Sequence, residues 1–284
     1  MKMENEFSGK ILYYYCPLDA FVSIIKNKQL WLSCVEDTND KLELDYASHL
    51  VRQFAKKIGK ENPELQQKCN DLIAAYKKDD WYDSPYIACF SGKGHNLSQW
   101  RLYADDAKGM AIGFSGDKLQ EKLEINIGEY ESILKAGYRG YKVKYANKKY
   151  KDQLYENIKD KLTKKGMICM DNLDRRLLTE ELCLKDEVFK FEDEYRILYY
   201  PKLSKRDESG TALEISKDML STKKIDFRIR DGKLVSYFKM PIDGCIESVR
   251  LGPKCDCSKS VIQKFLTACG FADVLVKKDS APYR

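Results

Sequence analysis

The sequence predicts an α+β fold: a single domain with a central, mostly antiparallel sheet and helical insertions. Short apolar or alternating segments typical of strands recur from residues 10–15 to residues 273–276. Segments with helical periodicity separate them, without the regular strand–helix rhythm of a parallel sheet. The pair Asp231-Gly232 lies between two alternating segments and therefore predicts an antiparallel hairpin.

Composition excludes several classes of protein. The 284 residues are enough for one large domain, and no apolar run is long enough to cross a membrane. The N-terminus lacks the apolar core of a signal peptide, so we expect a cytoplasmic protein without membrane partners. Ten cysteines are scattered and two histidines are far apart. We therefore expect reduced thiols and no metal site. Net charge is +6 with acids and bases intermixed, which permits contact with nucleic acid without requiring it.

The first part of the chain combines two strands with an insertion. Residues 10–15 form an aromatic-rich strand, Pro17 begins a short helix, and residues 30–32 begin a second strand. Asn39 or Asp40 would cap the following helix. Two helical stripes then predict an all-helical insertion at about residues 43–78.

The central stretch, residues 86–115, contains most of the unusual residue types. Residues 86–90 are apolar on both faces, which predicts a buried central strand with Ala88 and Phe90 in the core. A glycine-containing loop follows, and Ser98 is the expected N-cap of a short helix. The next strand, residues 109–115, alternates large and small side chains, so we expect room on its small face for another backbone or a ligand.

The remaining chain adds strands and a second insertion. Residues 137–146 alternate as a half-exposed strand, and residues 150–185 form a mostly helical insertion whose second stripe holds Leu173, Leu177 and Leu178. The C-terminal elements are the hairpin strands 226–230 and 233–239, the strand 245–251, a helix capped by Ser258 and the strand 273–276.

The candidate binding residues gather around the central loop. A guanidinium beside the start of a helix suits an anion such as a diphosphate, and aromatic side chains suit stacking on a ring. Considered one at a time, these residues could equally have a structural role, either packed in the core or in an ion pair. The candidates for substrate binding are Ser91, His95, Ser98, Gln99, Trp100, Arg101 and Tyr103.

A second informative stretch is FKFEDEYRILYY, residues 189–200. We expect one strand that places Glu192, Glu194 and Arg196 on the same face. Two carboxylates on one face repel unless cations hold them, and Lys190 and Arg196 are in position to do so. A charged edge strand is one interpretation. The other is a carboxylate pair that stabilises a cationic transition state, as in cleavage of glycosidic bonds.

Several segments occur together in an order typical of one family. Taken as a set, they resemble the bacterial domain-of-unknown-function family 2971 over nearly the whole chain. The segments are ILYYYCPLDAFVSIIKNKQLWLS, Asn39-Asp40-x-x-Glu43, YIACFS, SQWRLYAD, KGMAIGF, FEDEYRI, VRLGPK and SAPYR.

The opening strand and helix are also similar to the start of ADP-ribosyltransferase folds. Residues 193–197 resemble the strand that carries their catalytic glutamate, and residues 108–114 resemble their central strand. The resemblance implies NAD as substrate, Glu194 as catalytic residue, and Glu192 positioning a nucleophile or water. In those folds a strand histidine often contacts ribose, and here Tyr14 takes that place. Arg196 belongs to the same expected site.

Three functional hypotheses follow. The first is an NAD-cleaving or ADP-ribosyl-transferring enzyme, in a bacterial defence or stress response, with a protein or nucleic acid as acceptor. The second is a nucleic-acid binding or processing module that uses Arg139, Lys142 and Lys144 for phosphate contacts. The third is a sensor that binds a nucleotide without chemistry. The paired carboxylates favour the first, because a pure binding module does not need them.

Overall fold

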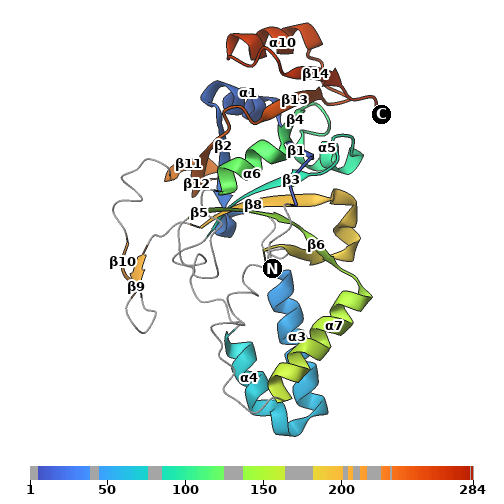
Figure 1. Ribbon diagram of the computed structural model, residues 1–284, viewed down its shortest axis with the longest axis vertical. Coiled ribbons are helices and arrows are strands. Elements are labelled where there is room, and N and C mark those ends of the chain that lie inside the picture. Colours follow the sequence, from blue (N-terminus) through green and yellow to red (C-terminus); the bar gives the residue numbers. More distant parts are fainter. Residues whose placement is uncertain are drawn as a thin grey trace. The chain divides into compact units, whose positions relative to one another are not determined.

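The computed structural model describes residues 6–38, 45–75, 85–124, 137–163, 182–200, 204–206, 212–215, 225–230, 232–281 and 283. Its contacts divide the chain into two compact units (Figure 1). Unit 1 consists of residues 1–37, 83–142 and 192–284, and unit 2 of residues 38–82 and 143–191. The segments predicted as helical insertions lie mainly in unit 2. The assignment of the whole chain to one domain stays a prediction.

Unit 1 contains the large sheet and its helices. Its strands are β1 (Ile11–Cys16), β2 (Gln29–Cys34), β3 (Tyr86–Ser91), β4 (Met110–Ser115), β5 (Gly137–Lys142), β8 (Glu194–Tyr200), β11 (Ile225–Arg230), β12 (Lys233–Pro241), β13 (Ile246–Leu251) and β14 (Leu275–Lys278). Its helices are α1 (Leu18–Asn27), the 3-10 turn η1 (Val35–Asp37), α5 (Leu97–Tyr103), α6 (Gly116–Glu124) and α10 (Lys259–Ala268). Two short strands, β9 (Ser204–Arg206) and β10 (Ala212–Ile215), pair with each other.

The large sheet has ten strands and branches at β3. Its main order is β11-β12-β2-β3-β1-β4-β13-β14, and β8 and β5 extend from β3. β8 pairs with β3 along its length, whereas β2 pairs with the first two residues of β3 and β1 with its last. Within this sheet the pairing of β13 with β14 is parallel and the other pairings are antiparallel. The predicted α+β class with a mainly antiparallel sheet is confirmed.

One face of the sheet forms the core of unit 1. Alternate residues of neighbouring strands point into it, among them Leu12, Phe90, Ile112, Tyr195 and Val249. Ala88 and Phe90 are only 4% and 2% exposed, so the predicted burial of these two residues is confirmed, whereas Cys89 between them is exposed. The opposite face of the same strands carries small, polar and charged residues beside a smaller apolar cluster that includes Tyr13, Tyr15 and Trp100. Its polar residues make it the face of functional interest.

Unit 2 has a helical core of its own. It contains α3 (Tyr46–Glu61), the 3-10 turn η2 (Pro63–Leu65), α4 (Gln66–Ala75), β6 (Lys144–Ala146), α7 (Lys148–Thr163) and β7 (Leu184–Asp186). Apolar stripes of α3, α4 and α7 pack together, as the helical periodicity predicted. Several predicted positions lie outside the described residues, namely the cap at Asn39 or Asp40, Glu43, and the stripe Leu173, Leu177 and Leu178.

Three local predictions were wrong. Residues 189–200 do not form one strand, because a 3-10 turn, η4 (Glu187–Glu192), precedes β8, and Asp193 has a left-handed φ of 47°. Residues 137–146 are likewise divided between β5 and β6, which belong to different units. The N-cap of α5 is Asn96, whose side chain accepts hydrogen bonds from the backbone amides of residues 98 and 99.

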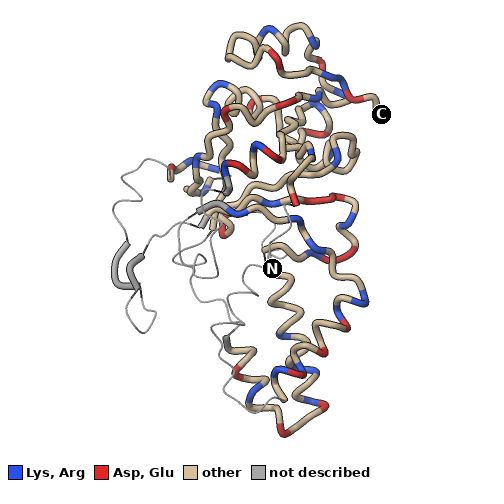
Figure 2. Tube along the Cα trace, in the orientation of Figure 1, with Lys and Arg blue, Asp and Glu red and all other residues tan. Residues whose placement is uncertain are grey.

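Charged residues of both signs follow one another along both units (Figure 2). Within the described part of the chain, no helix is long and apolar enough to span a membrane. The nine cysteines that the structure describes are free thiols. No group of three or more metal-ligating side chains occurs among the described residues.

Candidate functional site

Five residues on five neighbouring strands lie side by side across the polar face of the sheet. The register pairs Glu194 with Ser91, Ser91 with Tyr13, Tyr13 with Gly113, and Gly113 with Ser248. Directly paired residues of neighbouring strands project on the same face. We call this set the polar row. It brings together two residues predicted for the site, Ser91 and Glu194, from segments about a hundred residues apart.

Glu194 and Arg196 form a buried ion pair within β8. The guanidinium donates from Nε to Oε1 of Glu194 at 2.7 Å and from Nη2 to Oε2 at 3.1 Å. The two residues are 6% and 1% exposed. Two parallel hydrogen bonds of this kind fix the orientation of the carboxylate. Arg196 thus holds Glu194 as predicted, whereas Lys190 is exposed on η4.

Glu192 lies on η4 and not on the strand face of Glu194. Its backbone carbonyl accepts a hydrogen bond from the hydroxyl of Ser91 at 2.6 Å. The neighbouring carbonyl of Asp193 accepts one from the amide of Gly92 at 2.8 Å. These bonds hold the end of β3 against the start of β8. The predicted carboxylate pair on one strand is therefore replaced by a single strand carboxylate, Glu194, with a buried Glu192 at the end of η4.

The loop of residues 92–96 is fixed by a buried carboxylate from the C-terminal part of the chain. Asp279 lies 2.8 Å from Nδ1 of His95 and accepts a hydrogen bond from Nε1 of Trp100 at 3.1 Å. It also accepts the backbone amide of Ala281 at 2.8 Å. The imidazole is 58% exposed, while the Asp279 side chain is fully buried. A carboxylate at Nδ1 favours a proton there, which leaves Nε2 as an acceptor.

Trp100 is a core residue. It is fully buried and meets the ring of Tyr15 edge to face, with the ring centroids 4.8 Å apart. The hydroxyl of Tyr15 donates to the carbonyl of Lys93 at 2.7 Å, which adds another anchor for the loop. In this position the indole has no free face for stacking on a ligand ring. Its structural role follows from these contacts.

Tyr14 projects from β1 on the opposite face to the polar row. Its ring packs edge to face against Phe90, 5.8 Å away between centroids, and burial raises its pKa far above the ordinary value. The structure therefore does not bring Tyr14 together with Glu194. Tyr13, the preceding residue, lies in the polar row instead.

The remaining candidates lie on α5. Ser98 is half-buried, and Gln99 is buried. Arg101 is exposed, with its guanidinium 5.9 Å from the ring centroid of Tyr283. Tyr103 lines a surface pocket of about 890 Å³, together with residues of α1 such as Leu18 and Val22. None of the described contacts joins Arg101 or Tyr103 to the polar row.

The space expected on the small face of β4 is filled by neighbouring side chains. A Cβ atom at Gly113 would lie 3.2 Å from Cε1 of Tyr13 and would collide with Oγ of Ser248. The glycine therefore accommodates Tyr13 and Ser248. The alternation of β4 correctly indicated a close approach, but the approaching groups belong to this chain.

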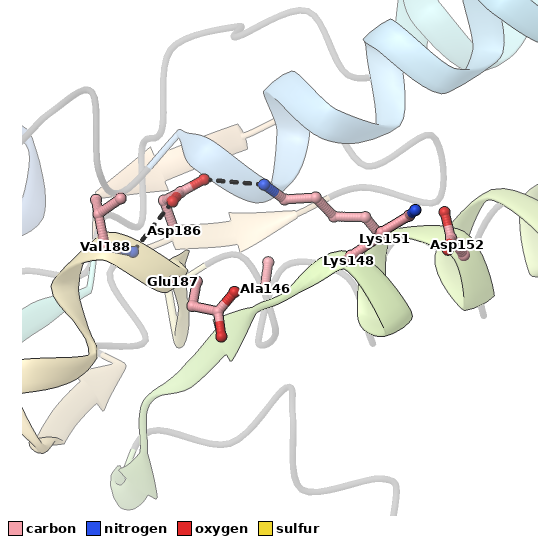
Figure 3. Close-up of a pocket in the computed structure, with 7 residues that line it drawn as sticks. All are labelled: Ala146, Lys148, Lys151, Asp152, Asp186, Glu187 and Val188. Carbon is pink, nitrogen blue, oxygen red and sulfur yellow. Dashed lines mark hydrogen bonds and ion pairs between the residues drawn. The ribbon is translucent and has the colours of Figure 1, made fainter.

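A second cluster of charged residues lies in unit 2 (Figure 3). Lys151 on α7 lies 3.0 Å from Asp186, which also accepts the hydroxyl of Tyr46 at 2.6 Å and the amide of Val188 at 3.1 Å. These interactions lower the pKa of Asp186 to about 2, chiefly through the bond from Tyr46. A pocket of about 550 Å³ adjoins this cluster. Its central carboxylate already has three donors, which indicates a structural connection of α3, α7 and β7.

Sequence reasoning missed Asp279 and Tyr13. Asp279 is 179 residues from Trp100 along the chain, so no local spacing connects them. Tyr13 lay within a run of three tyrosines, and the alternation of strand faces is the signal that separates it from Tyr14. Of the cations named for nucleic acid, Lys142 pairs with Asp193 at 3.3 Å.

Residues 99–197 match the model of a family described as "Protein of unknown function (DUF2971)". The match includes β4 and most of α5 and β8, whereas the polar-row residues on β1, β3 and β13 lie outside it. The resemblance expected over the whole chain is thus found for this segment. No curated protein and no solved structure matches the chain. These comparisons contain no support for the similarity to ADP-ribosyltransferases, which stays a hypothesis.

Proposed function

We propose that this protein binds a nucleotide, NAD being the first candidate, beside the loop of residues 92–96, and cleaves the bond between nicotinamide and ribose. One observation carries the proposal: the polar row ends at a carboxylate, Glu194, paired with the residue from which that loop begins. Glu194 and the ring of Tyr13 belong to the same row, and His95 belongs to the loop that follows Ser91 in that row.

Glu194 would act through its charge. As the bond between nicotinamide and C1 of ribose breaks, its electron pair leaves with the nicotinamide and positive charge develops on the sugar. A carboxylate whose orientation is already fixed stabilises that charge without reorganisation. Arg196 donates one hydrogen bond to each oxygen, which fixes the orientation of this carboxylate.

His95 would serve the second half of the reaction. Water or an acceptor hydroxyl forms a bond to C1 and must lose a proton to a base. Nε2 of His95 is suited to take it, because Asp279 lies at Nδ1 and the imidazole is 58% exposed. This replaces the role expected for Glu192, whose side chain is 3% exposed.

The experiment measures NAD binding by calorimetry and nicotinamide release by chromatography, for the wild type and for Glu194→Gln. The substitution keeps the shape of the side chain and removes its charge. We expect binding within a few-fold of wild type and loss of most turnover. Glu247→Gln, on the exposed side of β13, is the matched control and should retain both. Absence of NAD binding by the wild type would contradict the proposal.

A second candidate is a nucleotide sensor without chemistry. One specific observation favours it: both oxygens of Glu194 are engaged by Arg196, and the residue is only 6% exposed. A carboxylate committed in this way can serve stability alone. NAD binding with no nicotinamide release from the wild type would support the sensor and exclude the enzyme.

A further inference from the structure

Arg250 is a cation on the polar face of the sheet that has no acidic partner among the described residues. It lies on β13, paired with Ala111 of β4 on one side and Lys277 of β14 on the other. Its neighbours Val249 and Leu251 point into the core, so Arg250 projects on the face of the polar row. It is half-buried, and Lys277 beside it is exposed.

The guanidinium is held against the start of the central loop. It lies 5.4 Å from the ring centroid of Tyr13. A Cβ atom at Gly94 would lie 2.8 Å from Nε of Arg250 and would collide with the Tyr13 ring. The backbone of Gly94 therefore covers one edge of the guanidinium. Among the described residues, packing against Tyr13 and Gly94 positions Arg250.

Nε of Arg250 is buried without a hydrogen-bond partner in the described part of the chain. Asp279, the carboxylate that contacts this loop through His95, is already used by His95, Trp100 and the amide of residue 281. Burying a guanidinium without an anionic partner is costly, and such groups are usually paired or used for binding. Because Gly94 covers Nε and Arg250 is half-buried, an external anion would approach the other nitrogens of the guanidinium and compensate its charge.

We infer that Arg250 binds a phosphate group of the ligand, and that the site takes a phosphate-bearing nucleotide. This inference rests on the proposed nucleotide binding and names its anchor. Guanidinium suits phosphate because its planar nitrogens match two oxygens at once, and Lys277 adds positive charge on the same face. Arg101, the anchor expected from the sequence, is exposed on α5 and lies over Tyr283 instead.

The test uses calorimetry with ADP and, as the phosphate-free probe, adenosine. The variants are Arg250→Gln and, as the matched control, Arg228→Gln. Arg228 also has a buried, unpartnered Nε and lies over aromatic rings, but it is on β11 at the other end of the sheet. We expect Arg250→Gln to weaken ADP binding by about 10- to 100-fold and Arg228→Gln to leave it unchanged. Any adenosine binding should be the same in all three proteins.

Two results would overturn the inference: no binding of ADP by the wild type, or equal binding by wild type and Arg250→Gln. Should Arg250→Gln fail to fold, Arg250→Lys keeps the charge and loses the two-pronged geometry, so ADP should bind several-fold more weakly. Unchanged binding by Arg250→Lys in that case would also overturn it. Nicotinamide release is a separate measurement. Arg250-dependent ADP binding without NAD cleavage would contradict the proposed enzyme while the phosphate anchor stands.

Discussion

Glu194 and Arg196 meet within one strand because residues two apart on a strand project on the same face. The pair is almost completely buried, and each oxygen of the carboxylate receives one guanidinium nitrogen. Each group thereby compensates the burial of the other. The pair is therefore decisive for the stability of β8 as well as for the chemistry proposed at Glu194.

Replacing Arg196 by methionine should lower the free energy of unfolding by about 3–5 kcal/mol, because Glu194 would be left buried with its main cation removed. Urea denaturation measures the loss. The double variant Glu194→Leu/Arg196→Met removes both charges and should be clearly more stable than Arg196→Met alone. If the double variant lost as much free energy of unfolding as Glu194→Leu and Arg196→Met lose together, the two side chains would not be energetically coupled.

Phe90→Ala should cost roughly 3–5 kcal/mol, as other truncations of buried aromatic residues do. Phe90 is 2% exposed and meets the rings of Tyr14 and Phe114 edge to face. Phe227, which is 52% exposed on β11, is the control, and Phe227→Ala should cost less than about 1 kcal/mol. Thermal unfolding of both variants gives the comparison. Equal midpoints would show that β3 does not contribute to the core as described.

The pH dependence of stability should report the Asp186 cluster. The pKa of Asp186 is lowered from 3.8 to about 2 in the folded protein, first by the hydrogen bond from Tyr46 and further by the amide of Val188 and by Lys151, against a smaller opposing effect of burial. Because the pKa of Asp186 is lower in the folded protein than in the unfolded chain, the ionised carboxylate stabilises the fold at pH values above the ordinary pKa of aspartate. That contribution is lost as pH falls through about 2.

Asp186→Asn should therefore destabilise the protein by roughly 1–2 kcal/mol at pH 6, and the difference from wild type should shrink between about pH 4 and pH 2. Denaturation at a series of pH values measures it. Asp152→Asn, an exposed neighbour on α7, should show no such trend. If the difference in free energy of unfolding between wild type and Asp186→Asn stayed constant down to pH 2, the interactions assigned to Asp186 would be wrong.

Much of the fold could be predicted because its signals are local. The hairpin of β11 and β12 follows from alternation around Asp231-Gly232, and the burial of Phe90 follows from an apolar run. The cap of α10 at Ser258 was equally visible, since a cap depends on residues three positions apart. At α5 two polar residues competed for that position, and Asn96 occupies it.

The site was harder to predict because its contacts are distant in sequence. The polar row depends on the register of five strands, and Asp279 reaches Trp100 across 179 residues. Alternation also failed where the chain turns: the 3-10 turn before Asp193 moves Glu192 off the strand face. A pattern can place residues on one face only within an unbroken strand.

Gly94→Ala tests whether the central loop depends on close approach. The backbone at Gly94 does not have the left-handed φ that favours glycine, so alanine is conformationally allowed there. Its Cβ would nevertheless collide with the Tyr13 ring and crowd Arg250. We expect the free energy of unfolding to fall by about 1–3 kcal/mol, as overpacking produces.

In the background of Tyr13→Ala the ring is absent, so Gly94→Ala should cost much less there. Urea denaturation of the four proteins completes the cycle. An equal cost with and without the Tyr13 ring would show that the loop does not rest on Tyr13, and the placement of Arg250 beneath Gly94 would lose its support.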